Sequence, residues 1–202
     1  MTSRREFLHM GVAALALPMS AGAGLSLAGS GWSGEPAPMP FYKVVFDERF
    51  AASRAFAGEA QQLGLPTHGI RGDVTNLWFH DLSARWKQGP AAIAGLTQKG
   101  ALFCLDLLAR DQRMRLVYLG EHAPQPQGRV EHVLAGPPEV LRRASHLDES
   151  GPEWARQIAT LMSQFPGNQP QAGSPAIVAP LTGPGDDSEH LVSWVIAPRR
   201  AA

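Results

Sequence analysis

The segment Ala91-Ala92-Ile93-Ala94-Gly95-Leu96 decides the fold class of this chain. All six residues are apolar, with no alternation of polar and apolar side chains. Such a run is typical of a strand covered on both faces, as the central strands of parallel sheets are. The turn signal Gly89-Pro90 precedes it and the polar stretch 97–100 follows it. We therefore expect a central strand over 91–96.

Expected strands and helices alternate on both sides of this segment. The other expected strands are 42–46, 67–71 and 114–119, and the expected helices are 50–63, a second one capped by Asp73 or Thr75, and 100–111. This alternation predicts βαβ units with right-handed connections and a mostly parallel sheet. The expected fold class is α/β, Rossmann-like or flavodoxin-like in the loose sense, with about four βα units.

The C-terminal part is less regular and adds a helix and a β-hairpin to this core. Residues 129–134 are expected to return as a strand antiparallel to 114–119. Ser150-Gly151-Pro152-Glu153 matches a capping box and opens a helix, whose apolar stripe is Trp154, Ile158, Leu161 and Phe165. Residues 176–179 and 191–196 are expected as a final hairpin. Together these elements form one domain over 41–198, after a Gly-, Ser- and Pro-rich flexible lead-in over 29–40.

The first 28 residues have the three parts of a secretory signal. A basic start is followed by an apolar run over 10–17 and then by small residues. This run is too short to span a bilayer, which takes ~20 apolar residues. Cleavage is expected after Ala23 or Ala28. No cysteine lies near these positions, which excludes a lipoprotein anchor.

The segment Ser3-Arg4-Arg5-Glu6-Phe7-Leu8 closely resembles the twin-arginine (Tat) export signal of bacteria. Arg4, Arg5, Phe7 and Leu8 carry this resemblance, and His9 stands where the pattern often has Lys. The resemblance implies export of the folded chain by the Tat translocon to the periplasm or beyond. The mature domain resembles no family that we can name.

Composition narrows the choice of partners. The chain has 18 basic and 18 acidic residues, and 16 basic and 17 acidic ones remain without Arg4, Arg5 and Glu6. A net charge near −1 gives no electrostatic attraction to nucleic acid or to anionic membranes. The absence of a second long apolar run argues against a stable membrane anchor. The single cysteine, Cys104, cannot form an internal disulfide and is expected to be buried.

Polar residues follow each of the four expected parallel strands. The candidate ligand edge consists of Asp47, Arg71, Asp73, Thr97 and Lys99. In open α/β sheets the carboxyl ends of the strands meet at one edge, where ligands bind. Lys99 and the free amides of a helix start could hold a carboxylate or a phosphate there. The alternative is that these are ordinary polar turns and caps.

A second candidate site is a pair of histidines on the expected hairpin. His122 and His132 lie on the same face if the two strands pair with an even register sum, and a carboxylate from Glu121 or Glu131 could complete a Zn or Cu site. The register is decisive, because a slip of one residue turns a side chain to the other face. The alternative is a pair of surface or hydrogen-bonded histidines.

Two hypotheses for function follow from these patterns. No nucleophile elbow, phosphate loop or dinucleotide fingerprint is present, so the sequence indicates neither a catalytic residue nor a cofactor. The first hypothesis is a non-catalytic exported protein that binds a small ligand or serves as an accessory subunit of an exported enzyme. The alternative is a hydrolase or lyase for a small anionic substrate, with Asp47 or Asp73 as base and Lys99 or Arg71 holding the anion.

Overall fold

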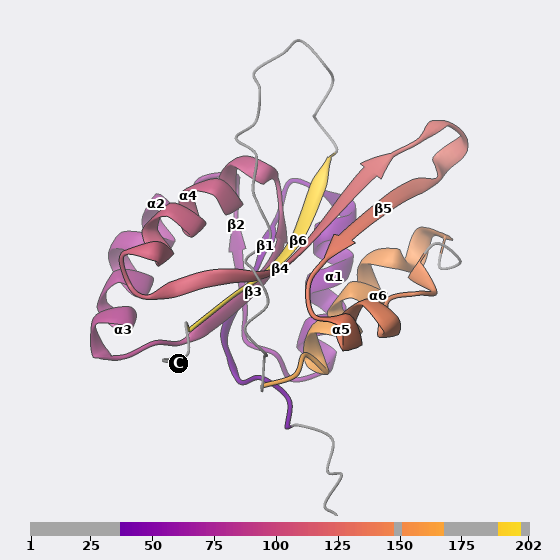
Figure 1. The fold of residues 1–202 in the computed structure, drawn as a ribbon. Helices are drawn as coiled ribbons and strands as arrows, with labels where there is room; N and C mark the ends of the chain where they lie inside the picture. Colours follow the sequence, from indigo (N-terminus) through magenta and orange to yellow (C-terminus); the bar gives the residue numbers. More distant parts are fainter. Residues whose placement is uncertain (1–36, 148–150, 168–189, 199–202) are drawn as a thin grey trace, which may run out of the picture. The chain divides into compact units, whose positions relative to one another are not determined.

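A computed structural model describes residues 37–147, 151–167 and 190–198 (Figure 1). The chain divides into two units, Met1–Gly34 and Glu35–Ala202, and the described residues all belong to the second. The export signal expected over 1–28, most of the lead-in and the strand expected over 176–179 lie outside the described residues.

The second unit is an α/β fold built on one six-stranded mixed sheet. Its strands are β1 (Phe41–Asp47), β2 (Thr67–Ile70), β3 (Ala92–Thr97), β4 (Met114–Pro124), β5 (Val130–Ala135) and β6 (Leu191–Pro198), in the order β2-β1-β3-β6-β4-β5. Only the pairs β1–β2 and β1–β3 are parallel, and the other three pairs are antiparallel. The α/β class is confirmed, but the expectation of a mostly parallel sheet is wrong.

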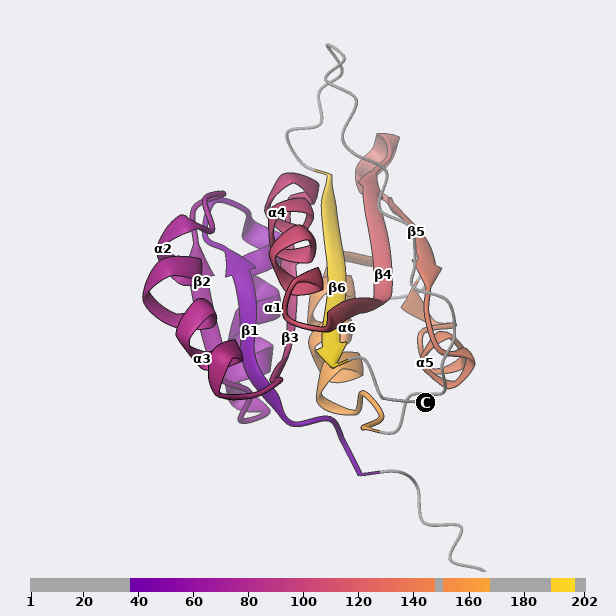
Figure 2. The same cartoon turned by 60° about the vertical axis from the view of Figure 1, so that its left-hand side comes forward.

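The departure comes from β6, which lies in the middle of the sheet instead of forming an appended hairpin (Figure 2). It enters between β3 and β4 and pairs antiparallel with both. Seven of its eight residues are buried, as expected for a strand with neighbours on both edges and cover on both faces. The run 191–196 is apolar except for Ser193 and so resembles 91–96, and that similarity is the sequence signal for a central strand.

The insertion of β6 still leaves β1, β2, β3 and β4 running in the same direction. β3 and β4 are both antiparallel to β6, so they are parallel in direction although they do not touch along their length. The carboxyl ends of these four strands therefore meet at one edge of the sheet. β5 pairs antiparallel with β4, as expected from the sequence.

Helices cover both faces of the sheet (Figures 1 and 2). One layer holds α1 (Ala51–Gln62), α5 (Pro138–Arg143) and α6 (Trp154–Ser163), preceded by the short helix η4 (Gly151–Glu153); the other holds α2 (Thr75–Leu77), the π-helical turn η1 (Trp78–Leu82), α3 (Ser83–Gln88) and α4 (Lys99–Arg110). The short helix η2 (Pro126–Gly128) lies in the connection between β4 and β5. No helix within the described ranges is long and apolar enough to cross a membrane.

Two apolar cores lie between the sheet and these layers. The stripe Trp154, Ile158, Leu161 and Phe165 is buried in the first core, as its spacing predicts. On α4 the buried stripe includes Leu102 and Leu105, and it leaves Cys104 on the outer side. The expectation of a buried cysteine is therefore wrong, because its position on the helix turns it away from the sheet.

Candidate functional site

The turn after β1 sits at the point where the chain changes faces. From β1 the chain passes into α1 on one face, whereas from β3 it passes into α4 on the other. Such a switch point at the carboxyl ends of parallel strands is where α/β proteins commonly bind ligands. The side chains that meet between the ends of β1 and β3 therefore decide whether a ligand can enter the switch point.

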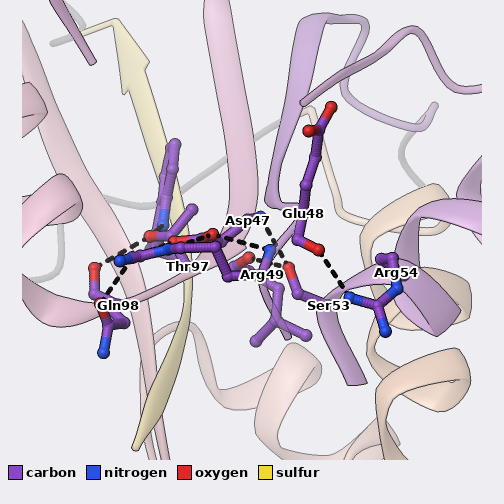
Figure 3. Close-up of polar contacts among 9 residues, drawn as sticks. Asp47, Glu48, Arg49, Ser53, Arg54, Thr97 and Gln98 are labelled. Atoms are coloured by element: carbon purple, nitrogen blue, oxygen red, sulfur yellow. Dashed lines mark hydrogen bonds and ion pairs between the residues drawn. The ribbon is translucent and has the colours of Figure 1, made fainter. Parts of the chain in front are cut away.

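An internal ion pair closes the switch point (Figure 3). Arg49 donates from Nε to Asp47 Oδ1 at 2.9 Å and from a terminal nitrogen to Asp47 Oδ2 at 2.6 Å. It also donates to Gln98 Oε1 at 2.7 Å, across the gap to the turn after β3. Asp47 is fully buried, and its hydrogen bonds raise the pKa of the Arg49 guanidinium. The Arg49 guanidinium therefore occupies both carboxylate oxygens of Asp47, the acceptor expected to bind a ligand.

The loop after β2 also touches this guanidinium. A Cβ added at Gly72 would lie 2.5 Å from a terminal nitrogen of Arg49, and Gly72 has the positive φ of +85° that glycine tolerates. Arg49 thus lies among the turns that follow β1, β2 and β3. The sequence places this arginine in the correct turn, but only the folded chain shows that it fills the gap.

Buried hydroxyl groups join the neighbouring elements beneath this ion pair. Ser53 Oγ accepts from the backbone N–H of Asp47 at 2.8 Å and donates to the carbonyl of Leu96 at 2.5 Å. Thr97 Oγ1 accepts from Trp194 Nε1 at 3.0 Å. These bonds connect β1, α1, β3 and β6, so Ser53 and Thr97 serve the fold.

The remaining residues of the expected ligand edge do not join this cluster. Arg71 and Asp73 are exposed, and the pKa of Asp73 is lowered by its hydrogen bonds from Thr75, whose backbone N–H lies 2.8 Å away. Lys99 forms an ion pair with Glu121 at 3.2 Å. Of the five expected residues, the structure joins Asp47 and Thr97 to the switch point and keeps the other three apart.

The two histidines do meet, and their rings lie edge to face, with an angle of 68° between the ring planes. His122 and His132 are directly opposite each other on β4 and β5, with 2.7 Å between their Nδ1 atoms. The indole ring of Trp154 lies 4.5 Å from the first imidazole and 5.3 Å from the second, between ring centroids. The strands thus pair with the even register sum on which the histidine pair depends, and the two residues are direct cross-strand neighbours.

The pair belongs to a buried hydrogen-bond network. His122 Nε2 lies 2.8 Å from Ser193 Oγ, and the Ser193 hydroxyl donates to the Tyr118 oxygen at 3.2 Å. Burial lowers the pKa of His122 well below its usual value, and the neighbouring His132 and His190 add to the effect. Burial also raises the pKa of Tyr118 to about 12. Both side chains are therefore neutral near pH 7.

This geometry does not support the expected Zn or Cu site. Strand side chains alternate between faces, so Glu121 and Glu131 lie on the face opposite to the histidines next to them. The described ranges contain no group of three or more His, Cys, Asp or Glu side chains that could hold a metal ion. The hypothesis of hydrogen-bonded histidines is the better one.

An open groove lies on the α1 side of this edge, and we call it the arginine groove. Its volume is about 570 Å³, and its walls are the start of α1, the turn between β4 and β5, and the start of α6. Arg49, Arg54 and Arg129 line it, together with His122 and Trp154. No carboxylate side chain is among the described residues that line it.

Two of these arginines have no anionic partner among the residues that the structure describes. Arg54 donates to the carbonyl of Glu48 at 2.6 Å, and it pairs with no carboxylate in the part of the chain that is described. Arg129 has no ion pair in that part either. The sequence pattern singles out neither of them, since nothing in a one-dimensional pattern brings residues 54 and 129 together. The sequence signal that could have indicated an anion site here is Phe-Ala-Ala at 50–52, which starts a helix without the usual capping side chain and so leaves its first amides unbonded by a cap.

No family model, curated protein or solved structure matches this chain.

Proposed function

We propose that this protein is exported and binds a small molecule in the arginine groove, as a non-catalytic binding protein. The observation that carries the proposal is the groove itself, a hollow of about 570 Å³ at the carboxyl edge of the sheet. This volume lies within the range of small-molecule sites, and this edge is where α/β folds commonly place them. Polar groups and apolar side chains share the walls, which suits a ligand of metabolite size.

The contacts of the expected catalytic residues favour binding over the hydrolase or lyase alternative. A general base must reach the proton that it removes. Both carboxylate oxygens of Asp47 accept hydrogen bonds from Arg49, and Asp47 is fully buried. Lys99, the expected anion holder, is paired with Glu121. Neither lines the arginine groove.

The other form of the first hypothesis, an accessory subunit of an exported enzyme, has less support, because the described surface shows no large apolar patch. Large exposed apolar side chains are few and stand apart on different elements: Leu63 after α1, Phe79 on η1, Leu107 on α4 and Val133 on β5. A protein interface normally gathers such side chains in one patch. The arginine groove, in contrast, gathers charged and apolar side chains in one hollow, so we place the function there.

The export part of the proposal rests on the resemblance of residues 3–8 to a twin-arginine signal. A Tat substrate folds before it crosses the membrane, which would allow a ligand to bind before export. The periplasm or the extracellular space is then where the protein works.

Native mass spectrometry of the chain purified from the periplasm of its own host tests both parts. We expect a chain processed after Ala23 or Ala28 that carries a co-purified small mass. The variant with Arg4→Lys and Arg5→Lys keeps the charge of the signal and should stay unprocessed in the cytoplasm, because the Tat pathway reads the arginine pair.

A pair of tryptophan variants locates the bound mass. Ala51→Trp places a large side chain in the groove, where it should displace the ligand, whereas Ala84→Trp makes the same change at an exposed position of α3 and should not. A bare chain from the native periplasm, or a ligand retained equally by both variants, would contradict the proposal.

A further inference from the structure

The charges in the arginine groove are out of balance with the rest of the protein. The whole chain has equal numbers of basic and acidic residues, yet the described residues that line the groove include three arginines and no carboxylate. Asp47 neutralises Arg49, whereas no carboxylate of the described ranges forms an ion pair with Arg54 or Arg129. Concave walls focus the field of such charges and raise the local concentration of anions.

The hydrogen-bond donors of the groove also favour an anionic ligand. A guanidinium has five N–H donors, and Arg54 uses one of them on the carbonyl of Glu48. The first turn of α1 opens into the groove at Ala51 and Ala52. Phe50 offers no capping side chain, and this turn has no acidic residue. Free amides at a helix start and arginine side chains bind oxyanions in the same way.

The rest of the wall differs from that of a site for an inorganic ion. Phe50, Val130, Trp154 and Leu191 contribute apolar surface beside the charged groups. His122 adds no positive charge near pH 7, because burial lowers its pKa well below the usual value. A ligand that satisfies both parts of the wall has an anionic end and an apolar body.

We infer that the ligand of the arginine groove is a small organic anion, with a carboxylate or phosphate group held by Arg54, Arg129 and the first-turn amides of α1. This inference rests on the proposed function, since it names the chemical class of the molecule that the groove binds. Arg49 also lines the groove, but its positive charge is already paired with the Asp47 carboxylate. The anion contacts come from Arg54 and Arg129, the two lining arginines without a carboxylate partner in the described part of the chain.

Isothermal titration of the processed chain with three probes tests this inference. Succinate and inorganic phosphate represent the two sources of the anionic group, and succinamide is the neutral counterpart of succinate. We expect succinate or phosphate to bind in the range up to about 10 mM, as ligands of so few atoms do, and succinamide not to bind. The anion that binds more tightly identifies carboxylate or phosphate as the group recognised.

Charge variants locate the contact. Arg54→Gln and Arg129→Gln should each weaken binding of the probe roughly tenfold, since each removes charged hydrogen bonds to the anion. Arg71→Gln is the matched control: it removes the same charge from an exposed arginine at the same sheet edge, outside the groove, and should leave binding unchanged. Unfolding curves of all three variants check that they are folded.

Two outcomes would overturn the inference in different ways. If neither anion binds, or if succinamide binds as well as succinate, the groove does not select for negative charge. If Arg71→Gln weakens binding as much as the groove variants do, the anion binds elsewhere on the edge. In both cases a native mass that Ala51→Trp displaces would still support the proposed function, so the two failures can be told apart.

Discussion

At the scale of the residue, His122 shows how burial changes the chemistry of one side chain. Only 1% of its surface is exposed, and both ring nitrogens have partners, in His132 and Ser193. A protonated imidazole at this place would lose most of its hydration and face a second imidazole. The folded protein therefore holds His122 in the neutral form, whereas the unfolded chain lets it titrate near its ordinary pKa of 6.5.

This difference predicts a loss of stability on acidification. Below pH 6.5 the unfolded chain binds a proton at His122 that the native protein does not bind, so the free energy of unfolding falls as the pH falls. The contribution approaches a slope of about 1.4 kcal/mol per pH unit below the unfolded pKa. Above pH 7 it is absent. Urea unfolding between pH 7.5 and 5.5 measures this slope, above the range in which carboxylates titrate.

The variant His122→Gln isolates the contribution of this histidine. It should unfold more easily at every pH, because it disturbs a buried network, and its stability should depend less steeply on pH. The pKa of His68 is also lowered by burial, so part of the slope remains in the variant. Equal slopes for the variant and the wild-type protein would show that His122 titrates alike in both states.

At the scale of the element, the central strand β3 depends on a residue without a side chain. β3 pairs with β1 on one edge and with β6 on the other. A Cβ at Gly95 would lie 2.5 Å from the Val45 carbonyl oxygen and 2.5 Å from a ring carbon of Trp194. The backbone of β1 cannot move away without breaking its pairing with β3. Gly95 therefore sets how closely Trp194 packs over the sheet.

The variant Gly95→Ala should be destabilised by about 3 kcal/mol, the upper range for overpacking in a core. Gly58→Ala is the matched control in the middle of α1, where an added Cβ meets nothing within 4 Å. It should be stabilised by about 0.5–1 kcal/mol, because alanine restricts the unfolded chain. Urea unfolding of both variants makes the comparison, and a small effect at Gly95 would mean that the strands can separate at low cost.

At the scale of the whole molecule, β6 is the element that joins the two halves of the sheet. β3 and β4 have no pairing with each other, and each pairs with β6. Seven of the eight residues of β6 are buried, between the two apolar cores. The last described segment of the chain is therefore needed to complete both cores.

Truncation tests this dependence. A chain that ends at Glu189 lacks β6 and should lose cooperative unfolding, since β3 and β4 would each present an unpaired edge. A chain that ends at Pro198 keeps β6 and should unfold like the full chain. Far-ultraviolet circular dichroism during thermal unfolding distinguishes them. A sharp transition in the shorter chain would show that the sheet closes without β6.

The sequence by itself determined the α/β class, the order of most helices and strands, and the antiparallel hairpin that carries His122 and His132. These features depend on local periodicity and on turn residues, which a one-dimensional pattern records directly. The same information placed Asp47 and Thr97 at the carboxyl ends of their strands. It also supports the twin-arginine interpretation of residues 3–8, which lie outside the described residues.

Only the tertiary structure decided the position of β6, the closure of the switch point and the composition of the groove. Strand order depends on which apolar faces fit together. A run such as 191–196 indicates a buried strand, but it does not indicate which strands will pair with it. Arg49 pairs with Asp47 and Gln98 because three turns converge in space. Arg54 and Arg129 are 75 positions apart in the numbering and meet in one groove, because α1 and the β4–β5 turn border the same edge of the sheet. Contacts of such long range are properties of the packed chain, and the function proposed here depends on them.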